Sequence, residues 1–248
     1  MNGIHSKNKM DKKVLVIQAR MGSKRFPGKM MASFAGLTII DWVLGRAKRA
    51  KKVDEFVLAI PESTENNVLA EKGQHYGYTI IRGAEEDVLS RFAKAALLTN
   101  ADIIIRVCAD NPFICPNEID RLIKFFLKKR PDYSFNHINM MNNNYPDGLG
   151  AEIFTRLVLE DLNVSCSNNY HREHVTSYIW DNLYKYIVLT FNAPKNIAFP
   201  NIKLDIDFEE DLSYLEQVIS KVLKNNSEYE NTLFDLSPEL FLGVINNG

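Results

Sequence analysis

The sequence contains little cysteine, and the spacing of its cysteines is wrong for a metal or redox motif. The three cysteines, Cys108, Cys115 and Cys166, form no CxxC pair, and an odd number cannot all be joined within one chain. Four of the five histidines have no ligand-like spacing to one another. We therefore expect neither a disulfide framework nor a zinc site, but reduced thiols that serve packing.

Long apolar runs and an excess of either charge are missing as well. The apolar stretches fall far short of the roughly 18 residues of a membrane span. With 30 Lys and Arg against 31 Asp and Glu, the formal charge is −1, so we expect neither nucleic acid nor a membrane among the partners. The polar start lacks the apolar region of a secretory signal, and this predicts a flexible tail over residues 1–12 and a cytoplasmic protein.

Short β-rich apolar runs alternate with amphipathic helical patterns along the 248 residues. Buried strands are predicted at 14–17, 56–60, 78–81, 103–107, 186–191 and 202–206. Helical spacing is found at 37–50, 117–129, 172–182 and 208–223. The alternation predicts an α/β fold, with a single doubly wound, mostly parallel sheet in one domain over residues 13–248. A turn-rich stretch at 133–154 predicts a loop or hairpin insertion.

A strongly basic loop follows the first predicted strand. Residues 18–29, QARMGSKRFPGK, carry four cations, and two glycines allow a ligand to approach the backbone. A P-loop has four residues between its glycines and then Lys-Ser or Lys-Thr, whereas five residues separate Gly22 from Gly28 here and Met30 follows Lys29. The dinucleotide pattern GxGxxG is also absent. The loop therefore predicts a triphosphate site of another kind.

Six segments of the chain resemble, in the same order, the motifs of one family. Residues 20–29, RMGSKRFPGK, resemble the signature RxGSTRLPGK, and residues 82–89, RGAEEDVL, resemble RGSEEDVL. The series continues with RVCADNP at 106–112, YPDGL at 145–149, REHVT at 172–176 and DFEEDL at 207–212. Over residues 13–220 the chain thus resembles the superfamily of CMP-KDO synthetase and acylneuraminate cytidylyltransferase, and within it the SpsF-like branch.

The resemblance implies a nucleotidyltransferase of GT-A-like or Rossmann-like architecture. Such an enzyme transfers CMP from CTP to an acidic sugar or a phosphorylated acceptor with release of pyrophosphate, for surface polysaccharide biosynthesis. The resemblance assigns Arg20, Arg25 and Lys29 to the triphosphate and, with Asp110, to catalysis. It also implies that Asp110 and Asp207 bind Mg²⁺, and paired carboxylates are ligands that this ion prefers. Taken alone, each aspartate also fits a helix cap, Asp207 above all.

The resemblance also indicates residues around the nucleotide and the acceptor. Further nucleotide contacts are expected from Ala19, Gly22, Ser23, Arg82, Gly83 and Asp87. The acceptor is expected at Arg106, Asp147 and His174. Arg106 equally fits an inward arginine paired with an acid, and His174 equally fits a capping or core residue. A homodimer is implied, with residues 133–154 as the acceptor and dimerisation region.

Two departures from the family pattern bear on the substrate. SpsF-like sequences read PDGLDVEVF where this chain reads PDGLGAEIF, so Gly150 replaces a carboxylate. They read GDCP where this chain has ADNP at 109–112, which leaves Asp110 in place. Two alternatives stay open. One is a GT-A-type glycosyltransferase that uses a nucleotide-sugar through a DxD motif at 205–207, and the other is a non-catalytic nucleotide-binding relative.

Overall fold

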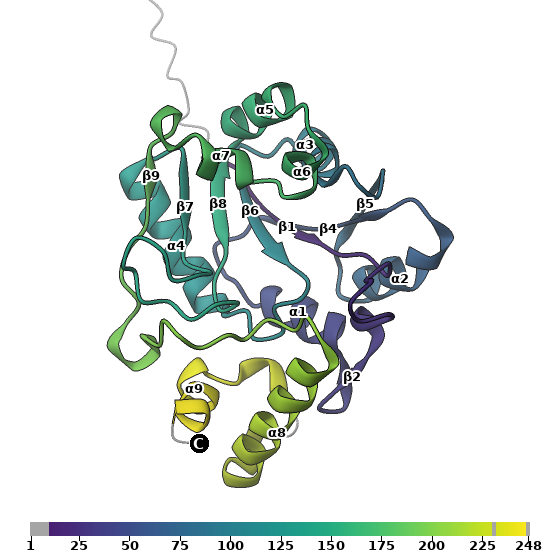
Figure 1. Ribbon diagram of the computed structural model, residues 1–248, viewed down its shortest axis with the longest axis vertical. Coiled ribbons are helices and arrows are strands. Elements are labelled where there is room, and N and C mark those ends of the chain that lie inside the picture. Colours follow the sequence, from purple (N-terminus) through teal and green to yellow (C-terminus); the bar gives the residue numbers. More distant parts are fainter. Residues whose placement is uncertain (1–9, 230–231, 247–248) are drawn as a thin grey trace, which may run out of the picture.

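The computed structural model describes residues 10–229 and 232–246. One seven-stranded sheet forms its centre (Figure 1), with strands lying side by side in the order β5 (Thr79–Gly83), β4 (Glu55–Pro61), β1 (Lys13–Gln18), β6 (Ile103–Cys108), β8 (Glu152–Thr155), β7 (Tyr133–Phe135) and β9 (Val188–Leu189). Only β8 runs against its neighbours in this sheet; the other pairings are parallel. The predicted mostly parallel sheet is confirmed.

Helices cover both faces of this sheet, as expected for a doubly wound fold. One face packs on α1 (Ile39–Ala47), α2 (Asn67–His75), α4 (Pro116–Lys129), α8 (Glu209–Asn225) and α9 (Pro238–Asn246). The other face packs on α3 (Val88–Thr99), α5 (Arg156–Ser165) and α7 (Ser177–Asp181), and α6 (Asn169–Glu173) lies against α3. Residues of β1 alternate between the two cores, Leu15 and Ile17 in one and Val14 and Val16 in the other.

Local signals determine where α1 begins. The prediction started this helix at Leu37, but Leu37–Thr38 forms β3, which pairs with β2 (Ser33–Phe34) in a small hairpin. The Thr38 hydroxyl accepts from the Asp41 N–H at 3.3 Å, and the Asp41 carboxylate accepts from the Thr38 N–H at 3.1 Å. This reciprocal cap satisfies two N–H groups that the helix itself cannot pair, so α1 begins at Ile39.

The strand predicted at 202–206 is wrong. This segment forms a single bridge, between Lys203 and Asp147, although Leu204 and Ile206 are buried in the alternating way of a strand. Its backbone bonds to loops instead, since the Leu204 N–H donates to the Asp147 carbonyl and the Ile206 N–H to the Asp110 carbonyl. Period-two burial identified an extended chain correctly, but no strand lies beside it to complete a ladder.

Two other elements are shorter than predicted. The helix expected over 172–182 is divided into α6 and α7, because His174 leaves the helical conformation with a ψ of 71°. The Thr176 hydroxyl, in the interruption, donates to the Glu152 carboxylate at 2.5 Å. The strand expected at 186–191 is reduced to β9, which pairs only with β7 at the sheet edge.

The insertion at 133–154 is largely part of the protein's own core. It begins with β7 and ends in β8, and Tyr145 and Leu149 between them are fully buried. Met140 and Met141 are exposed at its tip. Most of this region therefore packs against the rest of the chain, and its tip is the part that stays accessible to a partner.

The start of the folded region lies before residue 13. The Lys12 carbonyl accepts from the Asp102 N–H at 2.9 Å, and the Lys12 N–H donates to the Asp102 carboxylate at 2.8 Å. Residues 1–9 of the predicted tail lie outside the described residues. Within the described ranges, no helix is long and apolar enough to cross a membrane.

The three cysteines are all free thiols. Cys115 and Cys166 are buried, and Cys108 is partly buried at the end of β6. Burial raises the pKa of Cys108 to about 12 and that of Cys115 above its ordinary value. A thiol that does not ionise near neutral pH is a poor nucleophile, so these residues have the properties of packing groups.

A buried arginine on α1 connects the C-terminal segment to the loop before α4. Arg46 on α1 is 1% exposed, and its guanidinium donates to the carbonyls of Ile114, Phe234 and Leu236 at 2.9, 3.2 and 3.0 Å. A planar group with five N–H donors is suited to three such acceptors. The chain after α8 is thereby joined to the loop before α4.

We predict that Arg46→Met lowers the free energy of unfolding by about 2–4 kcal/mol, because it leaves buried carbonyls unpaired. Urea unfolding followed by circular dichroism measures this loss. The matched control is Arg49→Met, which removes an exposed ion pair with Asp235 in the same C-terminal segment and costs less than about 1 kcal/mol. Equal losses in the two variants would contradict the role given to Arg46.

Candidate active site

The basic loop after β1 lies at the carboxyl edge of the parallel strands. Its first residue, Ala19, is buried and continues the pairing with β4 through a hydrogen bond from its N–H to the Ala59 carbonyl at 3.2 Å. Gly28 has a φ of 72°, a left-handed conformation that favours glycine. A 3₁₀ helix, Lys29–Met31, follows where a P-loop would lead into an α-helix. The loop therefore presents its side chains rather than a helix N-terminus.

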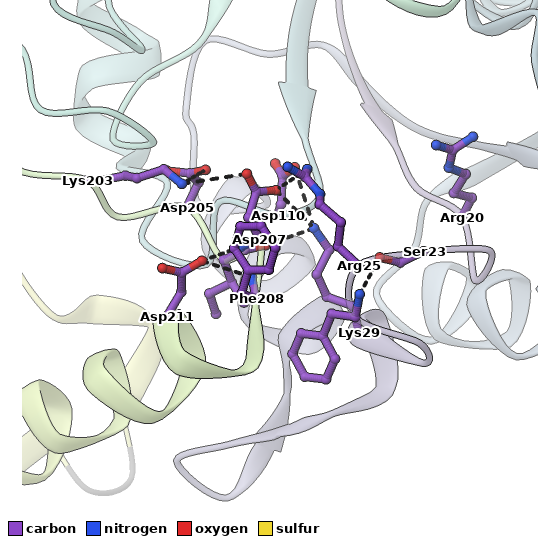
Figure 2. A network of polar contacts seen from close by, with 12 residues as sticks. Arg20, Ser23, Arg25, Lys29, Asp110, Lys203, Asp205, Asp207, Phe208 and Asp211 are labelled. Atoms are coloured by element: carbon purple, nitrogen blue, oxygen red, sulfur yellow. Dashed lines mark hydrogen bonds and ion pairs between the residues drawn. The ribbon is translucent and has the colours of Figure 1, made fainter.

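Lys29 brings together the two aspartates predicted as metal ligands. Its side chain is 10% exposed, and its ammonium lies 3.7 Å from Asp110 Oδ2 and 3.9 Å from Asp207 Oδ1. The same ammonium donates to the Ile206 carbonyl at 2.8 Å (Figure 2). Asp110 follows β6 and Asp207 precedes α8, so residues distant in the sequence meet at one buried cation.

Four further side chains complete this charged group. The Arg25 guanidinium contacts Asp207 Oδ1 at 2.6 Å, and Lys203 lies 3.1 Å from Asp205 and 3.5 Å from Asp207. The Asp211 carboxylate accepts the N–H groups of Asp207 and of the residue after it, both at 2.9 Å (Figure 2). Asp207 is thus held through both its backbone and its carboxylate.

Asp147 lies beside the same carboxylates. Its N–H donates to the Ile202 carbonyl at 2.9 Å, and the next residue, Gly148, turns the chain with a φ of 84°. Burial, and then the neighbouring charges of Asp205 and Asp110, raise the pKa of Asp147 to about 6 despite the opposing effect of Lys203. A loop residue predicted to bind the acceptor and a predicted metal ligand therefore share one electrostatic environment.

Arg20 points away from this group (Figure 2). It pairs with Glu173 of α6 at 3.0 Å and with Glu85 at 4.0 Å. The Glu85 carboxylate lies so close to Gly22 that a Cβ there would come within 2.7 Å of it. Ser23 caps the loop internally, since its hydroxyl accepts a backbone N–H three residues later at 3.2 Å. The predicted triphosphate cations are therefore divided between two acidic surroundings.

The other predicted nucleotide residues lie along the end of β5 and the start of α3. Arg82 donates to Asn67 at 2.8 Å. Gly83 has no side chain, and the aliphatic part of the buried Arg91 fills the space where a Cβ would stand. Asp87 caps α3 and pairs with Arg172 at 2.9 Å. One ion pair, Asp87–Arg172, joins this segment to α6, which also pairs with Arg20, so the segment lies on the Arg20 side of the loop.

Arg106 is engaged in a buried ion pair. Its guanidinium contacts the Glu152 carboxylate and donates to Gln18 at 3.0 Å. Glu152 also accepts from Tyr133 at 2.7 Å and from Thr176 at 2.5 Å. Burial alone would raise the pKa of Glu152, but the Arg106 charge and these donors outweigh it and lower this pKa. The inward pairing considered for Arg106 is the arrangement observed.

His174 occupies the exposed junction between α6 and α7. Its N–H donates to the Tyr170 carbonyl at 2.8 Å.

The expectation from the sequence missed the acidic partners of the predicted cations. Two of these glutamates stand inside the motifs already quoted, and Asp205 stands in the DxD pattern, so their presence was visible but their pairing was not. The missed residues are Glu85, Glu152, Glu173, Lys203, Asp205 and Asp211.

Gly150 has no space for a side chain. A Cβ at this position would overlap the Asn136 carbonyl oxygen. The Asn136 side chain is itself fixed, because it donates to the Glu118 carbonyl at 3.0 Å and accepts from the Ala151 N–H at 2.9 Å. The carboxylate of the resembling sequences therefore has no place in this packing, and the region before β8 is built differently here.

Comparison with known proteins finds relatives of this chain. The family model of cytidylyltransferases matches residues 14–235. The spore coat polysaccharide biosynthesis protein SpsF of Bacillus subtilis strain 168 is 30% identical over 213 residues, which span 84% of this chain and 86% of SpsF. These matches confirm the family resemblance.

Two solved structures are similar in fold. A cytidylyltransferase from Leptospira borgpetersenii serovar Hardjo-bovis strain JB197 has a TM-score of 0.80 at 30% identity and covers 96% of this chain and 93% of its own. CMP:2-keto-3-deoxy-manno-octonic acid synthetase complexed with CTP has a TM-score of 0.63 at 19% identity and covers 85% and 99%. The second similarity concerns the fold alone.

We predict that Gly150→Asp destabilises the protein by about 2 kcal/mol or more, because the new Cβ displaces Asn136 and its hydrogen bonds. Thermal unfolding is the measurement. Gly243→Ala is the control, since a Cβ there meets nothing within 4 Å in α9, and it should be neutral or stabilising by up to about 1 kcal/mol. A well-folded Gly150→Asp protein with unchanged stability would refute this account of the packing.

The raised pKa of Asp147 predicts a pH-dependent stability. The folded protein holds this proton more tightly than the unfolded chain, so the contribution of Asp147 to the free energy of unfolding falls from pH 3.8 to about pH 6 and is then constant. Asp147→Asn should therefore be more stable than wild type at pH 7.5, with the difference vanishing near pH 4. Thermal unfolding in EDTA over this range tests the expectation, and a difference independent of pH would contradict it.

Proposed function

The chain belongs to the cytidylyltransferase family, and from this membership we propose that it transfers CMP from CTP to a small acceptor with release of pyrophosphate. The observation that best supports this reaction is the buried Lys29 ammonium between Asp110 and Asp207, with Arg25 on the same carboxylate. Cations beside paired carboxylates at the carboxyl edge of a parallel sheet suit a polyphosphate and its metal ion.

In the proposed reaction, an acceptor oxygen forms a bond to the α-phosphorus of CTP and the bond from this phosphorus to the β-phosphate oxygen breaks. The protein's task is to hold the two reactants in line and to stabilise charge on the phosphate oxygens. Lys29 and Arg25 would contact the triphosphate from the aspartate side. Arg20 would exchange Glu173 or Glu85 for a phosphate oxygen.

The donor set fits Mg²⁺, which we propose as the cofactor. Asp205 lies near Asp110 and Asp207, and its buried Oδ1 has no hydrogen-bond partner among the described residues. In the described part of the chain, no three His, Cys, Asp or Glu side chains gather as a ligand set, so phosphate and water oxygens would supply the remaining ligands, as is usual for Mg²⁺. Asp110 and Asp207 would hold the ion, which when bound neutralises charge on the phosphates.

For the acceptor we propose an acidic sugar or a phosphorylated compound, used in making a surface polysaccharide. SpsF is named for spore coat polysaccharide biosynthesis, and the synthetase similar in fold is named for an acidic sugar. Asp147 and His174 are proposed to contact the acceptor, and Arg106 to support them through its buried pair. We further propose a cytoplasmic homodimer, which sedimentation equilibrium tests directly.

The family match favours this reaction over the two alternatives. A glycosyltransferase would use Asp205 and Asp207 as its DxD motif, but the same aspartates here face Lys203 and the basic loop that a triphosphate requires. A non-catalytic relative would bind CTP without releasing pyrophosphate. Pyrophosphate release with 2-keto-3-deoxy-manno-octonic acid and with phosphorylated polyols separates this alternative from the proposal.

We predict that CTP with Mg²⁺ raises the unfolding temperature by about 5–10 °C at 100 times Kd, since ligand binding stabilises the folded state. UTP, ATP and GTP should give smaller shifts. Removing Mg²⁺ with EDTA, or substituting Asp110→Asn, should abolish most of the CTP shift, because the phosphate charge is no longer balanced.

Glu160→Gln is the matched control, since it neutralises an exposed carboxylate on α5 that pairs only locally with Arg156. Its CTP shift should equal that of wild type. If CTP gives no shift, the nucleotide part of the proposal is overturned. If the CTP shift persists in EDTA, the metal part is overturned.

A further inference from the structure

A large aromatic side chain is exposed in the middle of the charged site. Phe208 directly follows Asp207 and is 44% exposed. Its backbone is held, because its N–H and that of Asp207 both donate to the Asp211 carboxylate at 2.9 Å.

The ring contacts the guanidinium of Arg25. The Arg25 Cζ lies 5.2 Å from the centre of the Phe208 ring, within the range of a cation–π interaction (Figure 2). The Arg25 side chain is 58% exposed and its guanidinium also contacts Asp207 at 2.6 Å. Two adjacent residues before α8 therefore hold one long side chain of the basic loop.

These two contacts would respond differently to a polyphosphate. An anion competes with the Asp207 carboxylate for the guanidinium N–H groups, because both bind along its edges. The Phe208 ring contacts the guanidinium charge through its own π-face, and a contact of this kind does not occupy the N–H groups as a carboxylate does. Lys29 needs no such support, since it is 10% exposed and is fixed by its surroundings.

We propose that Phe208 is a positioning residue that holds the Arg25 guanidinium through a cation–π contact beside Asp207, so that the N–H groups are ready for a polyphosphate. This inference rests on the proposed function for the identity of the ligand as a nucleoside triphosphate. It deepens that function by assigning to this chain an aromatic support for one triphosphate cation.

A double-mutant cycle tests whether Phe208 acts through Arg25. The Kd for CTP with Mg²⁺ is measured by isothermal titration calorimetry for wild type, Phe208→Leu, Arg25→Gln and the double variant. Phe208→Leu should weaken binding about two- to fivefold, the size expected of an exposed cation–π contact. In the Arg25→Gln background the same substitution should have no further effect, because the interaction is already absent.

Two further variants separate positioning from a merely structural role. Phe208→Tyr keeps an aromatic ring and should bind CTP as wild type does. Tyr214→Leu removes another exposed ring, 48% exposed on the same helix α8, and should also leave the Kd unchanged. Unchanged binding in Phe208→Leu, failure of Phe208→Tyr to restore it, or additive effects in the cycle would overturn the inference.

The inference and the proposed function fail in different ways. If wild type binds CTP but the cycle is additive, Phe208 does not act through Arg25 and the proposed function stands. If wild type binds inorganic tripolyphosphate but not CTP, the proposed function fails, and the cycle repeated with tripolyphosphate decides the role of Phe208. Binding of neither probe would overturn both.

Discussion

The site depends on one buried cation. The Lys29 ammonium stands between Asp110 and Asp207 and is anchored to the Ile206 carbonyl, so it joins the loop after β1 to two other segments. Without it, the repulsion between the two carboxylates would lose its shared counter-charge. Because the ammonium lies within 4 Å of both acids, the edge of the sheet is preorganised for an anionic ligand that arrives with a metal ion.

A second buried pair supports the other side of the site. Arg106 and Glu152 lie on adjacent strands and bind groups from β1, β7 and the junction between α6 and α7. Removing one member of such a pair leaves an uncompensated charge, which costs far more than the pair itself contributes. The short helices on either side of His174 are thus attached to the sheet by a charge network as well as by the apolar packing of α7.

Three of the four cations of the basic loop already have internal partners. Arg20 is paired with glutamates on one side, while Arg25 and Lys29 are paired with aspartates on the other. When a polyphosphate binds, a phosphate oxygen would therefore replace an internal carboxylate as the partner of each of these cations. In such an exchange the net gain is a difference between two strong interactions, and it depends on contacts such as that of Phe208, which do not compete for the N–H donors.

The sequence by itself determined the strands β1, β4, β5 and β6, the helices α1, α4 and α8 and the residue types of the site, because periodicity and motif spacing act over a few residues. It also contained Asp110, Asp207 and the basic loop in recognisable form. Only the tertiary structure decided that one lysine joins both aspartates, that Arg106 is turned to Glu152, and that residues 202–206 bond to loops. These outcomes depend on which distant segments become neighbours, and that is settled by packing and charge compensation across the whole fold rather than by local pattern.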